Sequence, residues 1–127
     1  MKTSSRKELR KAATSLQKIF VIETYDDLRD VYEEVLSSQG YEVNAFSCWQ
    51  AAHEKLQGGA TPHIMMFDPY QGGADELLGT FGQAGGRSGV SVFAISSLKA
   101  QQLSERHAYD AILQKPIDLD ELLKLLD

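Results

Sequence analysis

The stretch Ile64–Gly73, with the sequence IMMFDPYQGG, decides the fold of this chain. Four apolar residues run directly into Asp68, and a proline and a pair of glycines come soon after it. A short, continuous apolar run bounded by turn residues is typical of a strand that is buried on both faces of a parallel sheet. A carboxylate placed directly after such a strand would be partly shielded from water and still accessible at the edge of the sheet. Asp68 is therefore the first candidate for a functional residue.

Apolar runs and helical spacings alternate along the rest of the chain. We expect strands at residues 19–22, 41–46, 64–67, 90–95 and 111–113. Helical patterns fall between and after them, at residues 26–39, 47–57, 74–81, 98–107 and 118–126. Ser47 and Asp118 stand where N-cap residues are expected. Strands that alternate with helices in this way predict an α/β domain built around a parallel sheet.

Length and composition indicate one globular domain. Of the 127 residues, 43% are hydrophobic and 24% are charged, which is ordinary for a protein of this class. No apolar run approaches the roughly 18 residues of a membrane helix, and no N-terminal segment resembles a secretion signal. The single cysteine, Cys48, cannot form an internal disulfide, which fits a reducing compartment. We therefore expect a cytoplasmic protein that does not bind membranes.

The net charge of -5 is unevenly distributed. Residues 1–18 carry +5, so the remainder of the chain carries -10. Such an acidic body argues against nucleic-acid binding. We assign residues 1–17 to a basic N-terminal extension and residues 18–127 to the folded domain. Within the extension, a short amphipathic helix is predicted by the spacing of Leu9, Ala12, Ala13 and Leu16.

Polar residues follow four of the predicted strands at the point where each strand ends. Glu23 follows the first strand, Asp68 the third, Ser96 the fourth and Lys115 the fifth. Because right-handed crossovers place the carboxyl ends of parallel strands along one edge, these side chains should converge there. Two acids, a hydroxyl and a lysine at one edge predict a functional site rather than four separate turn residues.

With these residues in this order, the chain resembles the receiver domain of two-component response regulators. The match runs from Lys18 to Asp127. It rests on an acid after the first strand, a lone Asp after the third, a hydroxyl after the fourth and the pair Lys115–Pro116 after the fifth. The stretch QGYEV at residues 39–43 is also similar to that family. The resemblance implies a flavodoxin-like, doubly wound sheet of five strands in the order 2-1-3-4-5, with helices on both faces.

The resemblance also implies a function and a set of site residues. In that family the Asp accepts a phosphoryl group from a histidine kinase or phosphotransfer protein, and the domain then signals by altered binding to a downstream protein. Asp68 would be the acceptor, Lys115 the cation and Ser96 a hydrogen-bond donor to a phosphoryl oxygen. Glu23, Asp68 and the backbone carbonyl of Tyr70 would hold Mg²⁺, which prefers oxygen ligands and neutralises charge on the transferring group. Beyond modifying itself, such a domain is not an enzyme, and we expect a monomer or weak dimer.

Three positions depart from the family pattern. Thr24 stands where a second acidic residue is usual. It could cap the following helix, with Asp27 at the third helical position, or serve as a poorer metal ligand. Gly72 replaces a proline, and Ile112 replaces the aromatic residue that usually couples phosphorylation to the signalling face. Binding of Mg²⁺ is therefore expected to be weak or absent.

Two functions remain open at the level of sequence. The first is a phosphoacceptor domain, which the presence of Asp68, Ser96 and Lys115 favours. The alternative is a degenerate pseudo-receiver that acts as a phosphorylation-independent interaction module, which the three departures favour. A phosphohydrolase of this fold would need a second aspartate where Tyr70 stands.

Overall fold

The computed structural model describes residues 17–71, 89–97 and 109–126, so the helices expected before residue 17, at 74–81 and at 98–107 lie outside the described residues. No helix within these ranges has the length and apolar composition needed to cross a membrane. In chain order the elements are β1 (Lys18–Ile22), α2 (Asp26–Ser38), β2 (Glu42–Phe46), α3 (Trp49–Gln57), β3 (Ile64–Phe67), the 3-10 helix η1 (Pro69–Gln71), β4 (Ser91–Ser96), β5 (Ala111–Gln114) and α5 (Leu119–Leu126).

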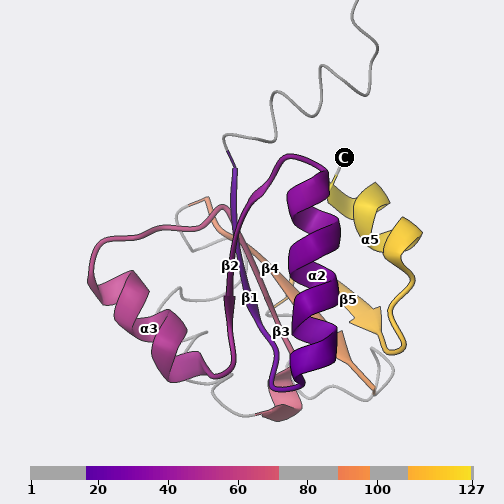
Figure 1. Cartoon of the computed structure of the whole chain (residues 1–127), viewed down its shortest axis with the longest axis horizontal. Coiled ribbons are helices and arrows are strands. Elements are labelled where there is room, and N and C mark those ends of the chain that lie inside the picture. Colours follow the sequence, from indigo (N-terminus) through magenta and orange to yellow (C-terminus); the bar gives the residue numbers. More distant parts are fainter. Residues whose placement is uncertain (1–16, 72–88, 98–108, 127) are drawn as a thin grey trace, which may run out of the picture.

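The strands form one parallel sheet in the order β2-β1-β3-β4-β5 (Figure 1). This confirms the predicted order 2-1-3-4-5 and the doubly wound architecture. Phe67, the last residue of β3, pairs with Ile22 on one side and with Ala94 on the other. The residues that leave β1 and β3 therefore enter their loops at the same level, which brings Glu23 and Asp68 to one edge of the sheet.

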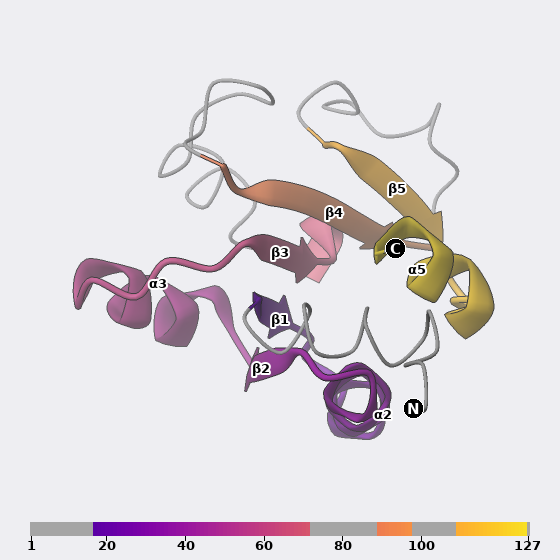
Figure 2. The ribbon, with the colours of Figure 1, turned by 90° about the horizontal axis from the view of Figure 1, so that it is seen from above.

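The helices cover the sheet on both faces, as predicted (Figure 2). Successive side chains of a strand point to opposite faces, and each face builds its own apolar cluster. One cluster includes Ala52 of α3, and the other includes Tyr32 and Leu36 of α2 together with Leu122 of α5. Both clusters bury residues of β1, β3 and β4, so the central strands are apolar on both sides. This double burial explains their continuous apolar sequences.

Two predicted helix boundaries are confirmed by local geometry. Gly40 follows the end of α2 with a φ of 96°, a conformation that glycine adopts without steric cost. Asp118 caps α5, because its Oδ1 atom accepts the backbone N–H groups of Asp120 at 2.9 Å and of Glu121 at 3.3 Å. Such a cap satisfies donors that have no partner within the helix.

Two other predicted N-caps are wrong. The N-cap of α2 is Tyr25 rather than Thr24, and that of α3 is Cys48 rather than Ser47. Neither of the actual N-cap residues caps its helix through its side chain. In α2 the N–H of Arg29 donates to the carbonyl of Tyr25 at 2.9 Å, so the helical hydrogen bonding starts there and Thr24 stays in the preceding turn.

Candidate functional site

Asp68 lies at the carboxyl edge of the sheet, directly after β3, and is 8% exposed. Pro69 has no N–H group, so the first backbone donor that follows the carboxylate belongs to Tyr70. That N–H donates to Oδ1 of Asp68 at 2.8 Å and closes a turn of the kind that Asp residues commonly form. The short helix η1 therefore fixes one carboxylate oxygen and leaves the other to face the neighbouring strands.

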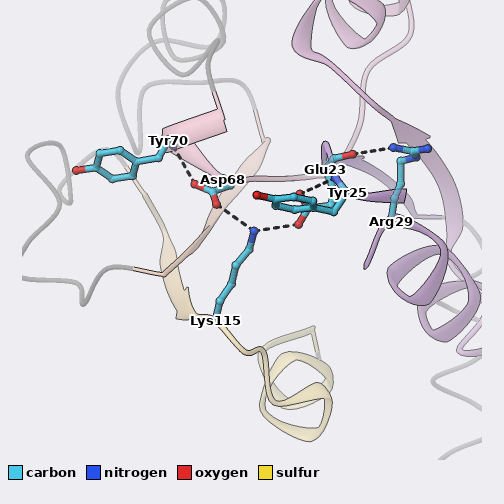
Figure 3. A network of polar contacts seen from close by, with 6 residues as sticks. All are labelled: Glu23, Tyr25, Arg29, Asp68, Tyr70 and Lys115. Carbon is cyan, nitrogen blue, oxygen red and sulfur yellow. Dashed lines mark hydrogen bonds and ion pairs between the residues drawn. The ribbon is translucent and has the colours of Figure 1, made fainter. Parts of the chain in front are cut away.

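Lys115 brings the predicted site residues together (Figure 3). It follows β5, and its Nζ atom lies 3.0 Å from Oδ2 of Asp68 and 3.0 Å from Oε1 of Glu23. Glu23 is 1% exposed, so its carboxylate depends on this ion pair for compensation of its charge. The predicted convergence of Glu23, Asp68 and Lys115 is thus present in the structure as one polar network.

Ser96, the predicted hydroxyl residue, is fully buried at the end of β4. The register pairs it with Gln114, the residue before Lys115. The backbone N–H of Lys115 donates to the carbonyl of Ser96 at 2.7 Å. Ser96 is therefore fixed at the same edge of the sheet and directly beside the segment that carries the lysine.

Lys115 keeps its positive charge although its side chain is largely buried. Burial by itself lowers the pKa of this ammonium group, because a charged group loses solvation. Burial is the largest single effect, but the hydrogen bonds to Asp68 and Glu23 and the negative charges of these two carboxylates together outweigh it, so the net pKa shift is upward from the usual lysine value. Lys115 consequently remains a cation throughout the physiological pH range.

The turn after β1 contributes two residues that the sequence pattern did not single out. Arg29 donates from its guanidinium to the carbonyl of Glu23 at 2.9 Å and pairs with the carboxylate of Asp26. The aromatic ring of Tyr25 lies near the ammonium of Lys115, with Nζ 5.7 Å from the ring centroid. The spacing of Asp26 and Arg29, three residues apart on a helix, was the available signal for the ion pair. No sequence signal pointed to the contact of Tyr25 with Lys115.

The donor set of this edge is limited for a metal ion. Glu23 and Asp68 supply two carboxylates, and Thr24, the residue after Glu23, carries a neutral hydroxyl. Across the described ranges, no group of three or more His, Cys, Asp and Glu side chains is arranged to hold a metal. Mg²⁺ is often held by one or two carboxylates together with water and the phosphate of a substrate. The residues present fit such a shared site, but they do not fit a site built by protein ligands alone.

An apolar groove of about 410 Å³ adjoins the site between α2 and the segment that follows β5. Leu28 and Val31 of α2 are exposed along it. Its lining consists of Leu28, Val31, Tyr32, Lys115, Pro116, Ile117 and Leu119. Lys115 is thus shared between the polar site and the groove, which places an apolar surface directly beside the carboxylates.

Tyr32 lies in the wall of this groove and is 1% exposed. Its hydroxyl is buried and has no hydrogen-bond partner within the described part of the chain. Burial raises the pKa of this hydroxyl above the usual tyrosine value, and the negative charge of Glu23 raises it further, whereas Lys115 partly offsets the effect. The side chain therefore packs as an apolar group despite its polar end.

No protein-family model and no curated protein sequence matches this chain. Solved structures match it at the level of fold. A CheY-like response regulator receiver domain from Methylobacillus flagellatus is 20% identical, with a TM-score of 0.70 over 87% of this chain and 96% of that one. The response regulator TrrA from Thermotoga maritima, solved with Mg²⁺ and BeF, is 18% identical, with a TM-score of 0.70 over 87% of this chain and 96% of that one.

A receiver domain in a complex is also similar in structure. The receiver domain of Ssk1 from Saccharomyces cerevisiae was solved together with the histidine phosphotransfer protein Ypd1. The structure matched is 14% identical to this chain, with a TM-score of 0.67 over 86% of this chain and 85% of that one. These likenesses confirm that the chain has the fold of response regulator receiver domains.

Proposed function

We propose that this protein is a phosphorelay receiver that accepts a phosphoryl group on Asp68 and signals through altered binding to a protein partner. The observation that carries the proposal is the position of the Lys115 ammonium, 3.0 Å from both Asp68 and Glu23 at the carboxyl edge of the sheet. A carboxylate is a usable nucleophile toward phosphorus only when nearby cations offset the charge of the phosphoryl group. The similarity in fold to receiver domains also supports a role as a phosphoacceptor.

In the proposed reaction an oxygen of Asp68 forms a bond to phosphorus. The bond between phosphorus and the nitrogen of a phosphohistidine donor breaks, and its electron pair stays on that nitrogen. Lys115 stabilises the phosphoryl oxygens as a point charge, and the hydroxyl of Ser96 donates a hydrogen bond to one of them. The N–H of Tyr70, which binds the Asp68 carboxylate, keeps the nucleophile oriented.

Mg²⁺ would be held by Glu23, Asp68 and the carbonyl of Tyr70. When bound, it would neutralise part of the negative charge that accumulates on the transferring group. We expect Mg²⁺ to bind weakly, because residue 24 is a threonine with a neutral hydroxyl instead of a carboxylate and Mg²⁺ binds neutral hydroxyls less well.

The apolar groove supports a protein partner. Leu28 and Val31 present apolar surface to solvent beside Lys115, and Ile117 and Leu119 continue it. Contiguous exposed apolar surface next to a polar site is typical of a protein-binding region. We propose that a histidine phosphotransfer protein or kinase contacts this surface while it delivers the phosphoryl group to Asp68.

The proposed function is tested by intact-mass spectrometry after incubation with acetyl phosphate, with and without Mg²⁺. A phosphoryl adduct that requires Mg²⁺ and is lost in Asp68→Asn is the expected result. The asparagine keeps the shape of the side chain, so loss of the adduct would not reflect loss of the fold. Circular dichroism of both proteins provides the control for folding.

The second candidate function is an interaction module that works without phosphorylation. The observation in its favour is the donor set, which has two carboxylates and a threonine where a phosphoacceptor pocket usually has three acids. No adduct from the folded wild-type protein, at any Mg²⁺ concentration, would contradict the first function and support this one.

A further inference from the structure

The side chain of Tyr25 contacts Lys115 and lies outside the apolar core. It is 63% exposed, although aromatic side chains usually gain stability by burial. The Nζ atom of Lys115 lies 5.7 Å from its ring centroid, within the roughly 6 Å range of a cation–π interaction. The ring therefore makes an electrostatic contact with the cation of the site while it contributes little to apolar packing.

The backbone of Tyr25 is held by the turn that leads into α2. Its carbonyl accepts the N–H of Arg29 at 2.9 Å. The guanidinium of the same Arg29 donates to the carbonyl of Glu23, also at 2.9 Å, and pairs with Asp26. Arg29 therefore connects both ends of the short turn from Glu23 to Asp26, so the direction in which the Tyr25 side chain leaves the backbone is restricted (Figure 3).

The ring complements two anions around one ammonium group. An ammonium has three N–H donors. One carboxylate oxygen of Glu23 and one of Asp68 each lie 3.0 Å from the Nζ atom of Lys115, and the centroid of the Tyr25 ring lies 5.7 Å from it. The face of an aromatic ring carries negative potential, so it favours the charged form of Lys115 without adding a formal charge.

We propose that Tyr25 is a positioning residue that holds the Lys115 ammonium beside Glu23 during phosphoryl transfer. Its role in the reaction rests on the proposed function. When Asp68 forms an acyl phosphate, its carboxylate charge is lost and Lys115 must exchange that ion pair for one with a phosphoryl oxygen. Glu23 and the Tyr25 ring keep the ammonium within reach during the exchange, which limits the orientations that the long lysine side chain can adopt.

The first test measures Lys115 in the unphosphorylated protein by NMR of its ammonium group. The variants are Tyr25→Phe, which keeps the ring, and Tyr25→Leu, which keeps an apolar side chain without a ring. We expect the ring-current shift and the order parameter of the Lys115 ammonium to persist in Tyr25→Phe and to fall in Tyr25→Leu. Because Tyr25 is largely exposed, both variants should fold. A Lys115 signal in Tyr25→Leu with wild-type shift and order parameter would overturn the proposal.

Tyr70→Leu is the matched control for this measurement. Tyr70 is exposed to a similar extent, at 60%, and its side chain points away from Lys115 (Figure 3). The Lys115 signal should therefore change less in Tyr70→Leu than in Tyr25→Leu. An equal change in both variants would contradict a specific contact with Tyr25.

The second test measures the rate of phosphorylation by acetyl phosphate. We expect the rate constant to fall about two- to fivefold in Tyr25→Leu, the scale of one partly exposed cation–π interaction, and to be rescued in Tyr25→Phe. A Tyr25→Phe variant as slow as Tyr25→Leu would assign the effect to the hydroxyl and overturn the role of the ring. If the wild-type protein itself is not phosphorylated, the proposed function fails, and the NMR measurement still decides whether Tyr25 positions Lys115.

Discussion

The ammonium of Lys115 joins Glu23 and Asp68, two carboxylates that lie 45 residues apart in the sequence, at equal distances of 3.0 Å. Both carboxylates are buried, and each would lose a compensating charge if the lysine were removed. This relationship makes Lys115 a structural residue as well as a candidate for the chemistry.

Replacement of Lys115 by methionine should therefore destabilise the protein. Removal of one partner from a buried ion pair leaves an uncompensated charge, and we expect the free energy of unfolding to fall by about 3 kcal/mol. Urea denaturation followed by circular dichroism measures the change. In the double variant Lys115→Met, Glu23→Gln the glutamate charge is absent as well, so part of the stability should return. A double variant less stable than Lys115→Met alone would contradict this account.

Removal of the Tyr32 hydroxyl should not lower the free energy of unfolding. That hydroxyl is buried without a partner among the described residues, and a buried unsatisfied polar group costs roughly 1–3 kcal/mol. We expect Tyr32→Phe to leave stability unchanged or to raise it by about 1 kcal/mol, with the same dependence on urea concentration. A loss of more than about 1 kcal/mol would reveal a hydrogen bond that the hydroxyl makes in solution.

Stability should decline at alkaline pH. The pKa values of Lys115 and Tyr32 are both raised in the folded protein, so the folded state holds these protons more tightly than the unfolded chain. Their contribution is fully present below the unfolded pKa values, about 10 for tyrosine and about 10.4 for lysine. It is lost as the pH rises through the folded values. Urea denaturation from pH 8 to pH 11 should show a decline that begins near pH 10 and is shallower in Tyr32→Phe.

The helix caps provide a prediction with an internal control. Asp118 accepts two backbone N–H groups at the start of α5, so Asp118→Ala should cost about 1 kcal/mol. Ser47 is exposed and lies one residue before the N-cap of α3, so Ser47→Ala should change stability by less than about 0.5 kcal/mol. Thermal unfolding of the two variants measures both effects. Equal losses would mean that Ser47 caps α3 in solution.

These caps also show what the sequence could and could not predict. The strands were predictable because an apolar run that is buried on both faces leaves a clear pattern, whereas their order was implied by the resemblance to receiver domains. Parallel strands joined by right-handed crossovers also share one carboxyl edge. For the same reason, Glu23, Asp68, Ser96 and Lys115 could be assigned to one edge before any geometry was known. The capping-box spacing was a poorer guide, since Thr24 and Ser47 both fit it and yet α2 and α3 each begin one residue later.

The environment of Lys115 could not be predicted in the same way. The contact of Tyr25 with the ammonium depends on where α2 begins, and α2 begins one residue later than the Thr24 interpretation assumed. When a helix begins one residue later, a different side chain points from the preceding turn toward the site. Contacts of this kind are set by tertiary structure rather than by the spacing of residue types.

The remaining prediction concerns Thr24, the main departure of this site from a complete acidic pocket. Thr24→Asp would place a third carboxylate next to Glu23, at the edge that already holds Asp68 and Lys115. We expect Mg²⁺ to bind about tenfold more tightly, which is the scale of one additional partly screened charge. Isothermal titration calorimetry measures the affinity, and the rate of phosphorylation by acetyl phosphate should rise with it if the proposed function is correct.

The matched control is Thr24→Asn, which has nearly the shape of aspartate without its charge. An equal gain in Mg²⁺ affinity from Thr24→Asn would mean that the added oxygen, and not the added charge, improves the site. No gain from either variant would contradict the placement of Mg²⁺ beside residue 24. The carboxylate should also lower the stability of the metal-free protein, because it adds a negative charge to a site in which one lysine already compensates two acids. Added Mg²⁺ should stabilise Thr24→Asp more than the wild-type protein, since a ligand that binds only the folded state stabilises it more when its dissociation constant is lower.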